Sequence, residues 1–437
     1  MNPGTATHQG ALAFGWRDGW RYGLMGLPLA FVALPLYVLL PNHYARAFGV
    51  PLASLGLLLL AARLFDAVID PLIGRWGDQL FARSVRAVLA WAALAAAALG
   101  LGFTLLFFPP ASLLPSMPAL LLWAALCLLL TYTGYSALSV LHQSWGAMLG
   151  GDARQRSRVV AWREGLGLAG VILAAVSPQA WGLPVTTALL FVALALGWLA
   201  WRRAPWPLPV GLSAGAAAGT GPAATPLGLP WQRPGFRPLL AVFMVNGIAS
   251  AIPATLILFF VQDRLQAAPA MEPLFLGTYF ACAALAMPLW LRAVAWLGLL
   301  RAWRLGMGLS VAVFVLAAQL GAGDTTGFLL VCALSGAALG ADLSVPGALL
   351  AGLIQRNGDL GRAEGSYFGW WNFATKLNLA LAAGLALPLL GVWGYEPGTR
   401  DSAALNTLTW AYCLLPCALK LLAAGLLQFL LIPKDRS

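Results

Sequence analysis

The sequence predicts an all-α integral membrane protein with twelve transmembrane helices in two halves of six. Hydrophobic residues make up 60% of the 437 and charged residues only 9%, and the mean hydropathy is +0.81. A soluble domain carries about 25% charged residues, so most of this chain must be solvated by lipid. A helix needs about 20 mostly apolar residues to cross a bilayer. With loops, the length of the chain accommodates about twelve such helices.

The apolar runs fall into two sets of six. The first set covers 20–41, 51–73, 86–108, 118–146, 159–180 and 185–203, and the second covers 238–262, 273–296, 302–321, 326–354, 366–393 and 403–431. The segment between them is rich in Pro, Gly, Ala, Ser and Thr, which is typical of a flexible linker. We therefore predict an N-terminal half at 1–203, a linker at 204–237 and a C-terminal half at 238–437.

The distribution of basic residues predicts the orientation. With both termini in the cytoplasm, nineteen of the 26 Lys and Arg residues fall in cytoplasmic loops and ends, and three fall on the other side. This is the positive-inside bias of a multi-pass protein in a cell (inner) membrane. It explains the net charge of +11 without a nucleic-acid partner, because no basic stripe with interleaved aromatic residues is present.

Cysteine and histidine offer no sign of a cofactor or a metal cluster. The five cysteines lie in apolar runs without a C-x-x-C pair, and the three histidines are far apart. An enzyme would need a nucleophile–base or metal constellation, so we expect no enzyme and no cofactor other than a coupling ion. A monomer in contact with membrane lipid is the default expectation.

Three charged residues in the second predicted helix are the strongest functional signal. Arg63, Asp66 and Asp70 share one helical face by their spacing. A charged group at the bilayer centre costs roughly 2.5–3.5 kcal/mol on insertion scales. Two carboxylates one turn apart can hold Na⁺ between them, or repulsion can make one of them carry a proton. The alternative is that the pair neutralises Arg63 or marks the end of the helix.

Other polar residues inside predicted spans are weaker candidates for a functional role. Lys376 is too deep to snorkel and needs a carboxylate or an anionic solute as its partner. Arg163 points inward or snorkels at a helix end, and Thr133 supplies an oxygen ligand or a helix–helix hydrogen bond. His142 lines a cavity or is a satisfied structural histidine. Lys420, near the end of the last span, is expected to snorkel.

A resemblance to a known family adds to these observations. Arg63-x-x-Asp66-Ala-x-x-Asp70-Pro71-x-x-Gly74, Arg163 and the stretch from Arg362 through Glu364 to Lys376 resemble motifs of the glycoside–pentoside–hexuronide:cation symporters of the major facilitator superfamily, which include melibiose permease. The resemblance implies a cation-coupling site at Asp66, Asp70 and Thr133, with Arg63 and Lys376 as charge partners. It places a substrate cavity between the halves, and the residues we expect to line it are Arg163, Tyr135, His142, Trp371 and Asn372.

The family pattern also has departures. The acidic residues that would grip a sugar correspond to about Ala30 and Ser136, and an asparagine of the motif corresponds to Ile69. We expect a secondary transporter that couples a small organic, sugar-like solute to H⁺ or Na⁺ by alternating access. The alternative on the same fold is a translocator of lysolipid or another amphiphile, to which the missing sugar carboxylates point.

Overall fold

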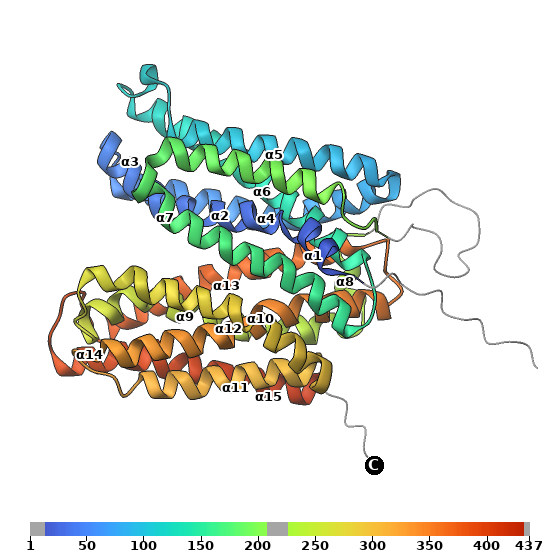
Figure 1. Ribbon diagram of the computed structural model, residues 1–437. Helices are drawn as coiled ribbons and strands as arrows, with labels where there is room; N and C mark the ends of the chain where they lie inside the picture. The colour runs from blue at the N-terminus through green and yellow to red at the C-terminus, as the bar shows by residue number, and fades with distance from the viewer. Residues whose placement is uncertain (1–13, 208–225, 432–437) are drawn as a thin grey trace, which may run out of the picture.

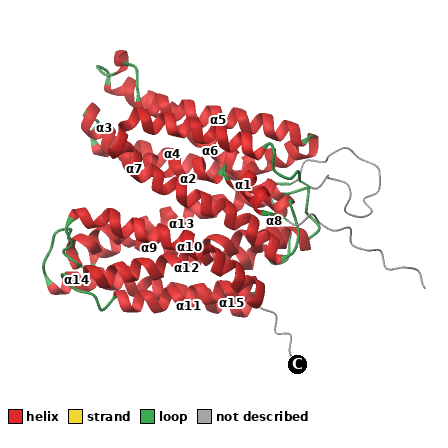
Figure 2. Ribbon diagram, in the orientation of Figure 1, coloured by secondary structure: helices red, strands yellow, loops and turns green. Residues whose placement is uncertain are grey.

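The computed structural model describes residues 14–207 and 226–431, and every regular element in these ranges is helical (Figure 2). The first bundle contains α1 (Trp16–Gly23), α2 (Gly26–Leu34), η1 (Pro35–Leu39), α3 (Leu40–Phe48), α4 (Leu52–Arg83), α5 (Val85–Phe107), η2 (Ala111–Leu113), α6 (Met117–Met148) and α7 (Ala153–Trp201). The second contains α9 (Phe236–Phe259), η3 (Phe260–Arg264), η4 (Pro269–Met271), α10 (Glu272–Leu297), α11 (Leu299–Ala317), α12 (Thr325–Arg356), α13 (Glu364–Val392), α14 (Ser402–Thr409), η5 (Trp410–Leu414) and α15 (Leu415–Leu430). Figure 1 shows the bundles side by side, with the short α8 (Leu229–Gln232) at one end. The predicted 204–237 linker includes 208–225, which lie outside the described residues, so the domain boundaries stay a prediction.

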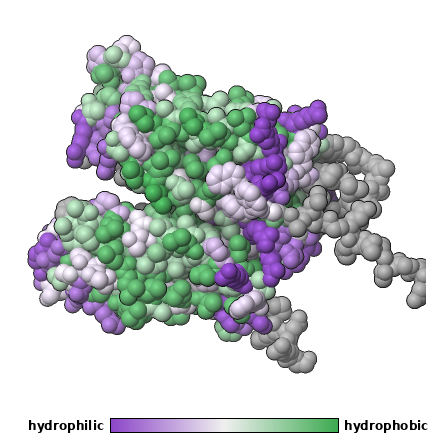
Figure 3. All heavy atoms as spheres, in the orientation of Figure 1, coloured by the Kyte–Doolittle hydropathy of each residue, from purple (hydrophilic) through white to green (hydrophobic). Residues whose placement is uncertain are grey.

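The helices have the dimensions and surface of membrane spans. Within the described residues, eight helices are long and apolar enough to cross a bilayer, and a ninth span results if the bent first helix is counted. One of the eight, α7, breaks at Gly182, where φ is +78°, so that it contains two of the expected spans. The charged helices α4 and α13, of 32 and 29 residues, complete the twelve. On the face seen in Figure 3, apolar residues cover the middle of the molecule and polar residues gather at its ends.

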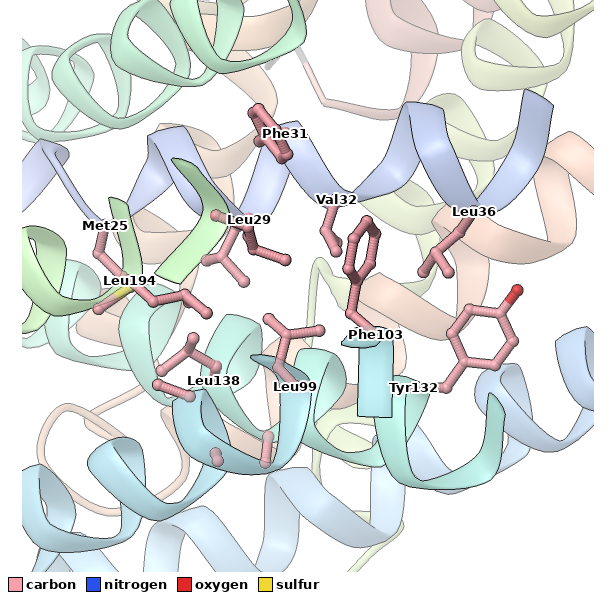
Figure 4. Packing of buried hydrophobic residues seen from close by; sticks show 14 of the residues in the cluster. Met25, Leu29, Phe31, Val32, Leu36, Leu99, Phe103, Tyr132, Leu138 and Leu194 are labelled. Carbon is pink, nitrogen blue, oxygen red and sulfur yellow. The ribbon is translucent and has the colours of Figure 1, made fainter. Parts of the chain in front are cut away.

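Proline reshapes the first span. Pro35 opens a π-helical turn, η1, and the helix on either side of it bends by 43°. A proline lacks the N–H that would continue the ladder of hydrogen bonds, and such breaks are tolerated where neighbouring helices surround them. Buried side chains from α2, α5, α6 and α7 pack against one another in the core of the first bundle (Figure 4).

The two bundles meet mainly at one end. We call the end that carries α8 and residues 149–152 and 357–363 the linker face, and the end that carries 108–116 and 393–401 the opposite face. The helix α4 packs along α13, and α7 packs against α10 and α12. Figure 3 shows a cleft between the bundles at the opposite face. The structure is therefore closed at the linker face and open at the opposite face.

Candidate functional site

An ion cluster joins the two bundles at the level of the central cavity. The ammonium group of Lys376, from α13, lies 2.7 Å from Asp66 Oδ1 and 2.7 Å from Asp70 Oδ2, both on α4. It also donates hydrogen bonds to Ser136 Oγ at 2.8 Å and to the carbonyl oxygen of Asp66 at 3.0 Å. Four oxygen atoms of the first bundle thus surround one nitrogen atom of the second. The three predicted residues of this cluster come together as the spacing and the resemblance implied.

The carboxylates of the cluster are shielded from solvent. Asp66 is 2% exposed and Asp70 is fully buried. The hydroxyl of Ser136 donates a 2.8 Å hydrogen bond to Asp66 Oδ1. Apart from its ion pair with Lys376, the carboxylate of Asp70 has no partner among the described residues. Buried carboxylates need such compensation, so Lys376 is the group that makes this site tolerable in the closed interface.

Glycines let α4 and α13 approach closely beside the cluster. A methyl group at Gly369 would lie 2.6 Å from the carbonyl oxygen of Asp70. One turn nearer the linker face, a methyl group at Gly74 would collide with the carbonyl oxygen of Gly365. Gly365 and Gly369 have the four-residue spacing that brings helices together in membranes. The sequence therefore positions Lys376 by allowing backbone contact over the two turns that precede it.

A latch at the linker face holds the same two helices. The carboxylate of Asp78 accepts hydrogen bonds from the backbone N–H groups of Gly365 and Ser366 at 2.6 and 2.9 Å, and from the Ser366 hydroxyl at 2.6 Å. A negative group at the first turn of a helix also interacts favourably with its dipole. Arg156 adds a 2.8 Å hydrogen bond to Gln355 across the bundles. Any opening of the linker face must break these contacts.

A cavity of about 390 Å³ lies between the bundles next to the ion cluster. Residues of both bundles line it, and Lys376 is one of them. Four of the five residues predicted for the cavity also line it: Arg163, Tyr135, Trp371, Asn372. Gln143 Nε2 donates to Asn372 Oδ1 at 3.2 Å and so bridges the bundles across it. The Arg163 guanidinium pairs with Glu164 at 2.5 Å. Phe243 and Trp371 stack with their ring centroids 3.8 Å apart. The cavity therefore presents hydrogen-bonding side chains next to a pair of stacked aromatic rings.

The structure does not bring three of the predicted residues to these sites. Arg63 is exposed and stacks over the ring of Tyr37 at 4.6 Å, and no ion pair joins it to Asp66 or Asp70 in the described chain. It precedes Asp66 by about one turn of α4, on the side away from Asp78. Thr133 is half-buried and makes no hydrogen bond to either aspartate among the residues described.

The third is His142, which does not line the cavity. It is fully buried inside the first bundle, where its Nε2 lies 2.8 Å from the carbonyl oxygen of Tyr22 and its ring stacks on that tyrosine with centroids 4.3 Å apart. The hydroxyl of Tyr22 donates back to the carbonyl oxygen of His142. This reciprocal contact ties α1 to α6 and favours the structural alternative, with Nδ1 left without a hydrogen-bond partner among the described residues.

Sequence reasoning missed two features. Ser136, at a position marked as a departure from the family, contacts both Asp66 and Lys376. Lys420 does not snorkel but is 5% exposed and pairs with Asp342 at 2.5 Å. Ser136 and Ser139 are three residues apart and so share a face of α6, a pattern that could have indicated the first feature. The second joins α12 to α15, and no local pattern relates these helices.

The fold and the site define a class: a two-bundle helical membrane protein of the major facilitator fold, with compensated charges beside a central cavity. Comparison with known families identifies the family within this class. The model of the family described as MFS/sugar transport protein matches residues 21–200 and 216–434, so the chain belongs to that family. The resemblance stated above is thereby confirmed.

The individual proteins that resemble this chain share low sequence identity with it. "Putative glycoside/cation symporter YagG" of Escherichia coli (strain K12) is 28% identical over 156 residues, which are 35% of this chain and 33% of that protein. The match thus spans about a third of the length of this curated relative. A bacterial homologue of the iron transporter ferroportin in an outward-facing state superposes with a TM-score of 0.68, 17% identity and coverage of 93% and 99% of the two chains. The E. coli fucose:proton symporter FucP superposes with a TM-score of 0.66 and 14% identity, and the match covers 95% of this chain and 99% of FucP. At such identities these two structures show the fold alone.

Proposed function

We propose that this protein is a secondary transporter that couples the movement of a small, sugar-like solute to a cation, H⁺ or Na⁺, by alternating access. One observation carries the proposal: Lys376 Nζ lies among four oxygen atoms at 2.7–3.0 Å, and all four belong to the other bundle. Oxygen atoms are the ligand type that hard cations prefer. The ammonium group is a tethered cation that a free one can replace.

Competition for this site supplies the coupling. A cation that binds between Asp66 and Asp70 removes the charge that holds Lys376, and the bundles lose an attraction across their interface. In turn, the return of Lys376 displaces the cation. Occupancy and bundle separation are therefore linked, as reciprocal coupling requires. Solute in the adjacent cavity contacts both bundles and biases the same equilibrium.

The positive-inside bias supports assigning the linker face to the cytoplasm. The structure, open at the opposite face, then corresponds to an outward-open state of a monomer in the inner membrane. A solute enters from outside, and breakage of the latch at Asp78 opens the other side.

A second candidate is a translocator of lysolipid or a similar amphiphile. The specific observation in its favour is that Ala30, where the family pattern has an acidic sugar ligand, lines the cavity. Binding of a lysophospholipid but of no sugar to the purified protein would favour this candidate over the first.

The test is uptake into proteoliposomes driven by a proton or sodium gradient, for sugars, organic anions and lysolipids. Asp70→Asn is expected to abolish gradient-driven uptake while solute exchange without a gradient persists. Undiminished driven uptake by this variant would refute the assignment. Asp324→Asn, at the opposite face and away from the cluster, is the matched control.

A further inference from the structure

The second bundle encloses a cavity of its own beside the central one. This C-terminal chamber has a volume of about 280 Å³, and its walls come from α9, α10, α11, α12, η5 and α15, with Leu34 from α2. Most of the lining is apolar, and much of it is aromatic: Tyr279, Phe280, Phe314, Tyr412. An apolar group that leaves water for such a site gains free energy in proportion to the area buried.

One border of the chamber is a buried ionic network. Lys420 Nζ donates to Asp342 Oδ2 at 2.5 Å and to Asn246 Oδ1 at 3.0 Å. Asp342 Oδ1 accepts from Asn246 Nδ2 at 3.0 Å and from Trp303 Nε1 at 2.9 Å. Both oxygen atoms of the carboxylate thus have partners. An ammonium group has three N–H donors, and Lys420 uses two of them within the described part of the chain. The remaining donor of Lys420 can bind one polar atom of a ligand.

The chamber adjoins the central cavity. Asp342 lines both spaces, and on α2 the neighbouring residues Ala33 and Leu34 line the central cavity and the chamber, respectively. Sites that hold a whole drug-sized ligand have volumes of roughly 300–1,000 Å³. At about 280 Å³ the chamber suits one part of a ligand whose other part lies in the 390 Å³ cavity.

We propose that the C-terminal chamber binds the apolar group of an amphipathic solute, an aryl or short branched alkyl glycoside, whose hydroxylated part lies near Arg163 and Gln143. This rests on the proposed function and narrows its substrate class. A free sugar has hydroxyl groups on all sides, and burying these against apolar walls would leave them without partners. A glycoside with an apolar substituent matches both spaces.

The test compares methyl and phenyl glycosides of the same hexoses for binding to the purified protein by titration calorimetry. For each hexose that binds, the phenyl glycoside should bind about 10- to 100-fold more tightly, as expected for burial of one aromatic ring. Ala254 and Ala241 are both exposed residues of α9, but Ala254 lines the chamber and Ala241 lines neither cavity. Ala254→Phe should remove the advantage of the phenyl group and leave methyl glycoside affinity unchanged, and Ala241→Phe should alter neither.

Equal affinities of methyl and phenyl glycosides, or an equal loss of both in Ala254→Phe, would overturn the chamber and leave cation-coupled transport intact. If no glycoside binds but gradient-driven uptake of another solute is found, the substrate class is wrong and the proposed function stands. If no solute is taken up under any gradient, the proposed function fails. The chamber is then decided by 4-bromophenol soaked into crystals: an anomalous bromine peak against Tyr279 and Tyr412 supports it, and no peak there overturns it.

Discussion

Lys376→Met removes the one positive charge that the structure places between two buried carboxylates. Removing one partner of a buried ion pair costs about 3–5 kcal/mol, because the other charge stays buried without compensation. Here both Asp66 and Asp70 are left, at 2% and 0% exposure. We therefore expect a loss of stability in that range. Adding Asp70→Asn removes one of the stranded charges, so the double variant should be more stable than Lys376→Met alone.

The assay is a double-mutant cycle on apparent melting temperatures and denaturant midpoints of the purified protein. Contacting residues show interaction energies of about 0.5–3 kcal/mol, and the buried ion pair of Lys376 with Asp70 at 2.7 Å places this cycle in the upper part of that range. Lys420→Met combined with Asp70→Asn is the control, since Lys420 pairs with Asp342 in the second bundle, and its effects should add. Additive effects of Lys376→Met and Asp70→Asn would show that the two side chains are not energetically coupled.

Three further predictions concern the interface. Asp78→Asn should weaken the latch by about 1–2 kcal/mol, seen as faster alkylation of a cysteine introduced at the linker face; an unchanged rate would contradict the role of the latch. Gly74→Ala should slow transport and lower the melting temperature because its methyl group meets a carbonyl of α13, whereas Gly56→Ala on the same helix meets nothing within 4 Å and should be neutral. Gln143→Leu should weaken solute binding about 2- to 12-fold, the value of one hydrogen bond, with cation affinity retained; equal solute affinity would exclude Gln143 from the site.

Periodicity and charge could predict much of the architecture. Composition requires membrane spans, and three- and four-residue spacing places Asp66 and Asp70 on one face of α4. A lone lysine deep in an apolar run needs an acidic partner, which is how Lys376 could be related to that pair. These inferences succeed because the bilayer penalises every uncompensated charge, whatever the details of packing.

The remaining features depend on contacts between helices that are distant in sequence. Arg63 shares the spacing of the aspartates, but its side chain is exposed and stacks on Tyr37, so the spacing does not lead to an ion pair. His142 and Tyr22 are 120 residues apart and exchange hydrogen bonds that no local pattern encodes. The ion pair of Asp342 with Lys420 likewise joins two helices of the second bundle. Helical spacing shows which residues share a face and leaves the neighbour of that face undetermined.

The role of Asp66 and Asp70 as a cation site can be tested by measuring cation binding to the purified protein. Radioactive sodium in equilibrium dialysis and proton uptake with a pH indicator are measured as a binding solute is added, for the wild type and for the double variant Asp66→Asn, Asp70→Asn. Solute should increase the binding of one of these cations to the wild type, and the double variant, folded and still able to bind solute, should show no such increase. The same solute-dependent cation uptake by both proteins would exclude Asp66 and Asp70 as the cation site.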